Sequence, residues 1–267
     1  MRELFMTTDN FGLGETGMSM DEQFRTVAEL GFNGIEHHFP ATRKMADCLR
    51  HYGLKMIHSE FPFNAPDRTG ARDDIDVLQE LGVQYVAGYS RARTHEEALR
   101  TAEELNTIGK QAYAYGFKVF FHNTAAEFIF DRGEYLIETL LKNTDPLYVC
   151  SQLDLGWVVC AGADPVPLLK KYPGRFELMH VKPCTKIYGM KAVWPAGQPT
   201  LEASEEYARL FHDMQGPFSQ LVRDYEEPMK VAERLGCRCF IYEREEYYQP
   251  DRLAVMQDDI AGLRRFW

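Results

Sequence analysis

The sequence lacks the features that mark a membrane or a secreted protein. No apolar stretch among its 267 residues approaches the roughly 20 that a helix needs to cross a bilayer. The first residues are typical of a strand and contain neither the apolar core nor the cleavage site of a signal peptide. The six cysteines form no Cys-x-x-Cys pair and no disulfide framework. We therefore expect a cytoplasmic protein, not bound to a membrane, with reduced and mostly structural thiols.

Basic residues are few and scattered, which argues against nucleic acid as the main partner. The chain has 30 lysines and arginines against 40 acidic residues, a formal net charge of −10, and no dense basic block. The phosphate backbone of a nucleic acid is therefore not the expected partner. This charge is compatible with a small neutral sugar, because a positive pocket can be local.

A recurring unit of helix, glycine and apolar run is the main pattern that is present. The glycine follows helical periodicity and is typical of a helix C-cap. The short β-branched and aromatic run after it is typical of a buried strand. Six copies begin at Gly31, Gly53, Gly82, Gly116, Gly174 and Gly236, and they end at Glu36, His58, Ser90, His122, His180 and Glu243. The unit predicts a parallel α/β enzyme whose active site lies at one rim.

Eight strands can be placed in this pattern. The first covers about residues 3–7, the second and third end at Glu36 and His58, and the others end near residues 88, 122, 153, 179 and 243. No linker divides the chain, so we predict one α/β domain over residues 1–267, a (β/α)8 TIM barrel. A doubly wound sheet is the alternative, but no glycine-rich phosphate fingerprint follows the first strand. Residues 184–218 are predicted to be a long loop insert that serves as a lid or binding loop.

Ionisable side chains gather at the predicted strand ends, where the catalytic groups of such barrels lie. They are Glu36, His37, His58, Glu60, His122, Glu127, Asp154, His180, Lys182 and Glu243. Carboxylates and imidazoles together suit a divalent ion such as Mn²⁺, Mg²⁺, Co²⁺ or Zn²⁺. Any one of these residues could be a solvated strand end. Their convergence on one rim indicates a site, because burying so many unpaired groups would be costly.

Two segments carry a resemblance to a known family. One runs through Leu153-Asp154-Leu-Gly-Trp157, Ala161-Gly162-Ala-Asp164-Pro165 and Gly174-Arg175 to His180-Val-Lys182. The other is His122-Asn-Thr-Ala-Ala-Glu127-Phe128, and Ile241-Tyr-Glu243 matches the closing acid of the family. The chain resembles the xylose isomerase-like barrel superfamily and, more narrowly, its sugar phosphate isomerase/epimerase group. The resemblance covers nearly the whole chain and is most specific between residues 116 and 183.

The resemblance implies one divalent metal ion held by two glutamates, an aspartate and a histidine. Asp154, His180 and Glu243 match three of these places. Glu127 is expected to be the fourth ligand, with His122 as a close substitute or a substrate contact. The resemblance also implies a homo-oligomer. Thr124 and Pro183 depart from the family pattern, in which a second histidine and an acid are common, and they leave the substrate undetermined.

The chemistry that the resemblance implies is proton abstraction next to the carbonyl of a sugar or keto-sugar. A metal polarises the carbonyl, a carboxylate removes the α-proton, and the metal stabilises the enediolate. Glu243 and Glu127 are the candidate acid and base, His122 is a further catalytic candidate, and Lys182 could stabilise the oxyanion. The candidate substrate contacts are His58 and Trp157, and an apolar wall is expected from Trp157, Phe61, Phe63 and Trp194.

The same site chemistry allows more than one outcome. Return of the proton gives an isomerase or epimerase, which is the function we predict, with a small carbohydrate as substrate. Loss of a β-substituent gives a dehydratase or lyase, which is the alternative. Two other classes are weighed against these. An apurinic-site endonuclease with three zinc ions is disfavoured by the acidic charge, and a metal-free binding or partner subunit would be expected to lack the matching ligands.

Overall fold

The computed structural model of the chain describes residues 2–12, 17–37, 41–59, 71–90, 92–193 and 201–266. The side chains of residues 71–74 and 201–204 are not part of this description. Four predicted site residues lie outside the described residues: Glu60, Phe61, Phe63 and Trp194. Within the described ranges, no helix is long and apolar enough to cross a membrane.

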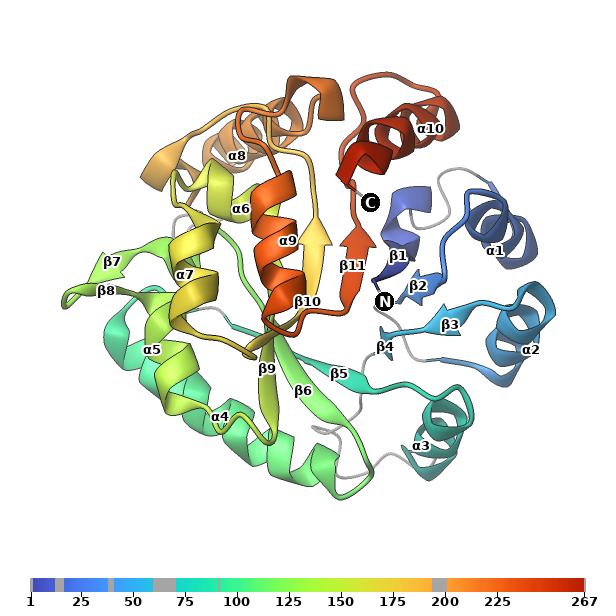
Figure 1. Cartoon of the computed structure of the whole chain (residues 1–267), viewed down its shortest axis with the longest axis horizontal. Helices are drawn as coiled ribbons and strands as arrows, with labels where there is room; N and C mark the ends of the chain where they lie inside the picture. Colours follow the sequence, from blue (N-terminus) through green and yellow to red (C-terminus); the bar gives the residue numbers. More distant parts are fainter. Residues whose placement is uncertain are drawn as a thin grey trace.

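A nearly closed parallel sheet forms the centre of the molecule (Figure 1). Its nine strand segments are β1 (Glu3–Thr7), β2 (Gly34–Glu36), β3 (Lys55–Met56), β4 (His58–Ser59), β5 (Tyr85–Gly88), β6 (Lys118–His122), β9 (Val149–Asp154), β10 (Phe176–Val181) and β11 (Cys239–Tyr242). They pair in the order β3-β2-β1-β11-β10-β9-β6-β5-β4. Only Ile57 separates β3 from β4, the two ends of this order, so the sheet returns on itself. The predicted (β/α)8 TIM barrel is confirmed.

Helices surround the sheet and connect its strands. The outer helices are α1 (Met20–Glu29), α2 (Arg43–Tyr52), α3 (Ala71–Glu80), α4 (His95–Tyr113), α5 (Leu136–Asn143), α7 (Pro165–Lys171), α9 (Glu226–Arg234) and α10 (Arg252–Leu263). The glycines that mark the repeating unit, such as Gly31 and Gly116 with φ of 87° and 88°, adopt positive φ. Ser19 and Glu22 form the capping box that begins α1. A small hairpin, β7 (Phe130–Asp131) with β8 (Glu134–Tyr135), precedes α5.

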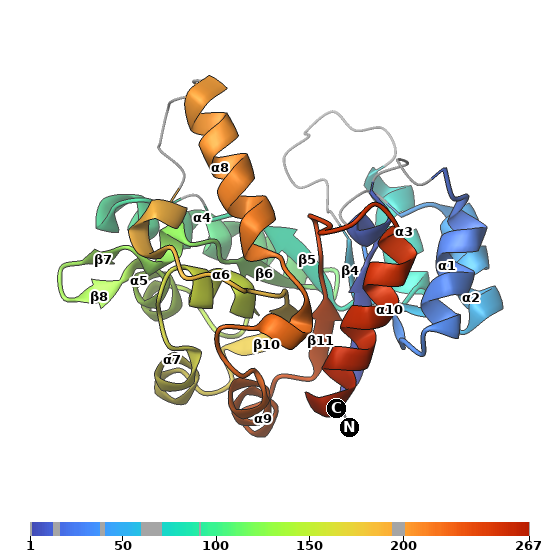
Figure 2. The same ribbon diagram turned by 90° about the horizontal axis from the view of Figure 1, so that it is seen from above.

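The predicted loop insert at residues 184–218 contains a helix. In place of a loop across residues 201–214 the structure has α8 (Leu201–Met214), and the 3-10 turn η3 (Gly189–Ala192) lies before it. Figure 2 shows α8 standing away from the barrel at the rim where the strands end. Tyr207, Leu210, Phe211 and Met214 recur at helical spacing. The polar residues between them and the prolines before them obscure this period in the sequence.

Two apolar clusters hold the barrel together. One lies between the sheet and the outer helices, and the other fills the inside of the barrel. The inner cluster consists of Phe5, Ile57, Tyr85, Phe120, Cys150, Leu178, Cys239 and Ile241. Because this interior is packed, polar side chains at the carboxyl ends of the strands rest on an apolar floor. The site is therefore confined to one rim of the barrel.

Candidate metal centre

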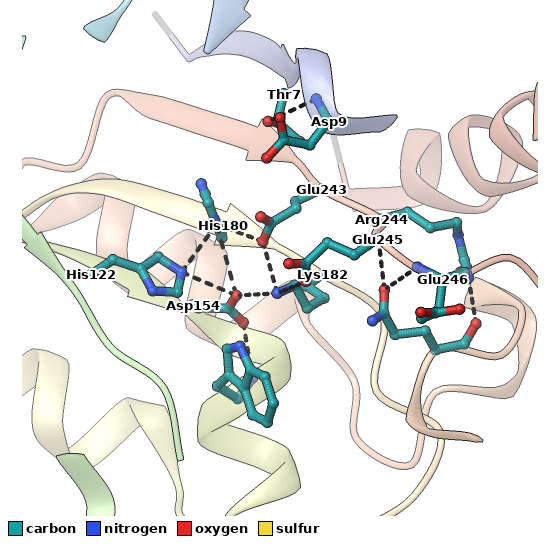
Figure 3. Close-up of polar contacts among 12 residues, drawn as sticks. Thr7, Asp9, His122, Asp154, His180, Lys182, Glu243, Arg244, Glu245 and Glu246 are labelled. Atoms are coloured by element: carbon teal, nitrogen blue, oxygen red, sulfur yellow. Dashed lines mark hydrogen bonds and ion pairs between the residues drawn. The ribbon is translucent and has the colours of Figure 1, made fainter. Parts of the chain in front are cut away.

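Four side chains meet at the carboxyl ends of neighbouring strands (Figure 3). His122 ends β6, Asp154 ends β9, His180 belongs to β10, and Glu243 directly follows β11. These strands are adjacent in the order β6-β9-β10-β11, and Asp154 pairs with His180 in register. One potential ligand atom from each residue lies within 4.8 Å of all the others. Parallel pairing thus brings together groups that are far apart in the sequence.

Asp154 uses its two carboxylate oxygens for different contacts. Oδ1 accepts a hydrogen bond from the backbone N–H of Trp157 at 2.9 Å and caps α6 (Leu155–Cys160). Oδ2 lies 3.3 Å from Nε2 of His122. The helix cap therefore fixes the carboxylate and leaves the second oxygen facing the site.

The donor atoms fit a divalent metal ion. Oδ2 of Asp154 and Oε2 of Glu243 are buried and have no aligned hydrogen bond, although positively charged groups lie close to both. Nε2 of His122 and Nδ1 of His180 face each other at 3.2 Å, so both cannot carry a proton there. Two imidazole nitrogens and two carboxylate oxygens are a ligand set that Zn²⁺, Mn²⁺ and Co²⁺ accept.

Opposite charges in the cluster stabilise the ionised forms of Glu243 and His180. Burial opposes ionisation of Glu243, but His180 and Lys182 outweigh it and lower the pKa of Glu243 to about 2. Burial likewise opposes the charge on His180, yet Glu243 and Glu36 raise the pKa of His180 well above its ordinary value. Burial lowers the pKa of His122. The two histidines of the cluster therefore differ in their preferred protonation.

A second layer of buried polar groups supports His180 from behind. Nε2 of His180 lies 2.7 Å from Oε2 of Glu36, whereas its Nδ1 lies 2.7 Å from Oε2 of Glu243. Nε2 of His58 lies 2.6 Å from Oε1 of Glu36. Gln152 donates to both oxygens of Glu36, at 3.2 and 3.3 Å. A carboxylate that binds the outer nitrogen of a ligand histidine fixes its tautomer and orientation.

The structure places His58 and Glu127 apart from the four converging side chains. His58 is fully buried against Glu36 and is not among the residues that line the cavity beside the cluster. Glu127 is fully buried in η2 (Ala126–Phe128), outside the group of four. Its carboxylate accepts hydrogen bonds from Oγ of Ser90 at 2.9 Å and from the N–H of Thr124 at 2.7 Å. Burial raises the pKa of Glu127. The structure brings His122 to the cluster instead.

Lys182 lies at the centre of the polar contacts in Figure 3. Its Nζ is 2.9 Å from Oε2 of Glu243 and 2.5 Å from Oε2 of Glu245. Gly156 makes this position possible, because a Cβ there would lie 2.9 Å from Cβ of Lys182. Partial desolvation in the cavity and the neighbouring Glu243 raise the pKa of Glu245 to about 7, against the attraction of Lys182. The sequence analysis missed Glu245, although it lies two residues beyond Glu243 and alternation along an extended chain indicates the same side.

A cavity of about 510 Å³ opens beside the cluster. Among its lining residues are His122, Trp157, His180, Lys182, Tyr207, Phe211, Glu243 and Glu245. The rings of Trp157, Tyr207 and Phe211 are nearly parallel, with centroids 5.7 to 6.2 Å apart. Nζ of Lys182 lies 5.3 Å from the ring centre of Trp157. One side of the cavity is therefore aromatic and the other carries ionisable groups. Tyr207 and Phe211 were missed because α8 was expected to be a loop.

A parallel barrel with histidines and carboxylates converging at its carboxyl rim defines the class of this protein. The chain belongs to the xylose isomerase-like TIM barrel family, whose model matches residues 24–265. It is 35% identical over 89 residues to inosose dehydratase of Clostridium tetani, and this match covers 33% of the chain and 29% of that relative. The inosose dehydratase of Salmonella typhimurium is 35% identical over 80 residues, covering 30% and 26%.

Solved structures show the same fold at lower identity. A sugar phosphate isomerase/epimerase from Parabacteroides distasonis superimposes with a TM-score of 0.73 and 19% identity, covering 98% of this chain and 93% of that one. The 3-keto-D-glucoside 4-epimerase of E. coli superimposes with a TM-score of 0.60 and 14% identity, covering 99% and 100%. Since the curated relatives match over less than a third of their own length, a substrate does not follow from these similarities.

Proposed function

We propose that this chain is an enzyme that depends on one divalent metal ion and removes the proton next to the carbonyl of a polyhydroxylated ketone. The observation that carries the proposal is the convergence of His122, Asp154, His180 and Glu243 within 4.8 Å, beside a cavity that three of them line. A divalent ion held there would supply Lewis acidity toward a carbonyl oxygen. The two histidines favour Mn²⁺, Co²⁺ or Zn²⁺ over Mg²⁺, which prefers oxygen ligands.

Glu245 is the group that we assign as the base. It lies outside the four donor residues, its side chain is 35% exposed, and it lines the cavity, so a substrate can reach it. Glu243 is then kept as a ligand instead of an acid or base. Glu127 has no part in this proposal, because it does not line the cavity and its carboxylate is bound by Ser90 and Thr124. This assignment gives separate residues to metal binding and to proton transfer.

Lys182 complements the base from the same side of the cavity. Its ammonium has three N–H donors and lies within 3.2 Å of carboxylate oxygens of Asp154, Glu243 and Glu245. When Asp154 and Glu243 hold a metal ion, an N–H of Lys182 becomes free to donate to the substrate oxygen that gains negative charge as the proton leaves. The parallel rings of Trp157 and Phe211 offer an apolar surface to the C–H face of a sugar or cyclitol ring. The cavity thus offers polar groups to the oxygens of a carbohydrate and an apolar surface to its C–H face.

Isomerisation or epimerisation follows if the proton returns to the substrate. Solved structures with this fold include proteins named as isomerases and epimerases, which is in line with this first candidate. Dehydration is the second candidate, and the adjacent Lys182 and Glu245 favour it. Elimination requires one group to accept the α-proton and another to protonate the departing hydroxyl. The partial match to inosose dehydratases supports this candidate as well.

Exchange of the α-proton with deuterated solvent tests the proposal. The protein loaded with Mn²⁺ is incubated with an inosose and, separately, with D-fructose, and both are followed by proton NMR. We expect loss of the α-proton signal from at least one ketone. A saturated isomer then indicates the first candidate, and an unsaturated product the second. A metal-loaded protein that exchanges no α-proton in a panel of cyclic and linear keto-sugars would contradict the proposal.

A further inference from the structure

Arg244 lies between the two glutamates of the site, and its side chain points the opposite way (Figure 3). Its guanidinium is fully buried together with Asp259 of α10. Nε donates to Oδ2 of Asp259 at 2.5 Å and Nη2 donates to Oδ1 at 3.0 Å. An ion pair taken fully out of water is weak evidence for stability alone, because desolvation offsets its attraction.

The other donors of Arg244 hold the end of α8. Nη1 donates to the carbonyl oxygens of Gln215 and Glu246, and Nη2 donates to the carbonyl oxygen of Gly216 at 2.9 Å. Together with the two bonds to Asp259, these contacts use all five N–H donors of the guanidinium. Gln215 and Gly216 directly follow α8, which carries part of the aromatic wall. One side chain thus joins the end of β11, α8 and α10.

Buried amide side chains fix the backbone on both sides of Glu243. Oδ1 of Asn10 accepts from the N–H of Arg244 at 2.6 Å, while Nδ2 of Asn10 donates to the carbonyl of Tyr242 at 3.2 Å. Oε1 of Gln215 accepts from the N–H of Glu245 at 3.0 Å. Gln215, which follows α8, therefore contacts the residues after β11 through both its backbone and its side chain.

We propose that Arg244 is a positioning residue. It fixes the carboxylates of Glu243 and Glu245 and links their position to α8, which carries Tyr207 and Phe211. The inference rests on the metal site of the proposed function. Because Glu243 and Glu245 flank Arg244, a shift of the backbone at residue 244 displaces both. Groups that orient a metal ligand typically change metal affinity 10- to 100-fold when they are altered.

The test compares Arg244→Lys with Arg175→Lys. Arg175 is a matched control, because it also donates from the barrel to buried acceptors, the carbonyl of Leu141 and Oγ1 of Thr144. It lies at the amino-terminal end of β10, away from the rim of the site. We expect Arg244→Lys to weaken Zn²⁺ binding by about tenfold or more in competition with a chelator. Arg175→Lys is expected to keep the affinity of the unchanged protein, even where it lowers the melting temperature.

Hydrogen exchange tests the link to α8. Zn²⁺ is expected to slow amide exchange at residues 205–216 of the unchanged protein, and to slow it less in Arg244→Lys. Equal slowing in both proteins would overturn this link. An Arg244→Lys protein with unchanged Zn²⁺ affinity would overturn the positioning role.

A second variant keeps the proposal testable if Arg244→Lys does not fold. Gln215→Met removes the acceptor for the N–H of Glu245 and leaves the guanidinium in place. We expect it to weaken Zn²⁺ binding several-fold, and unchanged affinity in this variant would overturn the link between the site carboxylates and the end of α8. If the unchanged protein binds no Zn²⁺, Mn²⁺ or Co²⁺, the proposed function itself fails and this inference with it. The two failures are therefore distinguishable.

Discussion

His180 contacts a different carboxylate through each of its two ring nitrogens. Nδ1 faces Glu243 in the candidate metal centre, and Nε2 faces Glu36 in the layer behind it. Since Glu36 is fully buried and is also paired with His58, it has little freedom to move. The orientation of the imidazole is therefore set by a residue that does not line the cavity.

The change Glu36→Gln tests this arrangement. Glutamine keeps the size of the side chain but removes the charge that orients the imidazole of His180. We expect metal affinity to fall about 10- to 100-fold while the fold is retained. Chelator competition measures the affinity, and circular dichroism checks the fold. Glu177→Gln is the matched control, because Glu177 lies in the same barrel at the other end of β10. Equal affinities for all three proteins would show that Glu36 does not orient the ligand.

The change Glu245→Gln tests the assignment of the base. The amide cannot accept the α-proton, so the rate of solvent exchange at the substrate is expected to fall by about 10²- to 10⁴-fold. Metal content should stay that of the unchanged protein, because Glu245 is not one of the four donor residues. Rapid exchange in a metal-loaded Glu245→Gln protein would show that another group is the base.

All four converging residues are among the strand-end candidates predicted from the sequence, but the resemblance favours Glu127 over His122 as the fourth ligand. Asp154, His180 and Glu243 come at or near the ends of apolar runs, which the sequence reveals directly. Glu127 matches a family motif, but it comes five residues after the end of β6 and turns into a buried 3-10 helix. His122 ends the strand itself. The register of β6 against β9 decides between them, and such register is a property of the folded sheet.

At the scale of elements, α8 supplies the part of the cavity that the sequence analysis missed. Tyr207 and Phe211 are four residues apart, so they lie on one face of α8 and meet Trp157 of α6. The apolar residues of this helix are separated by acidic and basic ones, and the predicted loop had the length and polarity of a binding loop. The sequence predicts a lid or binding loop at this position, and we propose the binding role for α8 instead.

The change Phe211→Ala tests the aromatic wall. We expect KM for the ketone to rise about tenfold, since a stacked ring contributes about 0.5–1.5 kcal/mol beyond the area that it buries. Metal content should not change. Phe130→Ala is a suitable control, because Phe130 is 64% exposed on β7 and does not line the cavity. Steady-state kinetics of both variants measure the effect. Equal KM values for Phe211→Ala and Phe130→Ala would show that α8 does not contact the substrate.

The first turn of α5 offers a prediction about stability and pH. Glu138 accepts from the N–H of Tyr135 at 3.1 Å and pairs with Lys171 of α7. Burial opposes its charge, but Lys171 and Tyr135 outweigh burial and lower the pKa of Glu138 below its ordinary 4.5. The ionised form therefore stabilises the fold above pH 4.5, and this contribution is lost as the pH falls through the lowered pKa.

The change Glu138→Gln should reduce the free energy of unfolding by about 1–2 kcal/mol near neutral pH. The difference from the unchanged protein should shrink as the pH falls below 4.5, because the unchanged Glu138 also becomes protonated once the pH passes its lowered pKa. Urea unfolding across this range measures both. Glu226→Gln, which breaks an exposed pair with Lys230, should have a smaller effect. A deficit that does not depend on pH would indicate lost packing instead of lost charge.

At the scale of the whole molecule, the repeated unit of helix, glycine and strand was sufficient to predict the barrel. Each copy specifies one strand and the helix before it, and parallel strands of this kind close into a barrel. The sequence did not show between which strands the sheet closes. The third predicted strand is interrupted at Ile57, so that β3 pairs with β2 and β4 pairs with β5. This division depends on the curvature of the closed sheet. A homo-oligomer stays a prediction.

We propose that His122, Asp154, His180 and Glu243, at the ends of four neighbouring strands, hold one divalent ion. Metal content, measured by plasma mass spectrometry on the unchanged protein and on Asp154→Ala purified without chelator, tests it most directly. We predict about one Zn²⁺, Mn²⁺ or Co²⁺ per chain in the unchanged protein and a nearly empty variant, because Asp154 supplies one of the four donors. No bound ion in the unchanged protein, even after incubation with these metals, would contradict the account, and about three zinc ions per chain would favour the nuclease alternative.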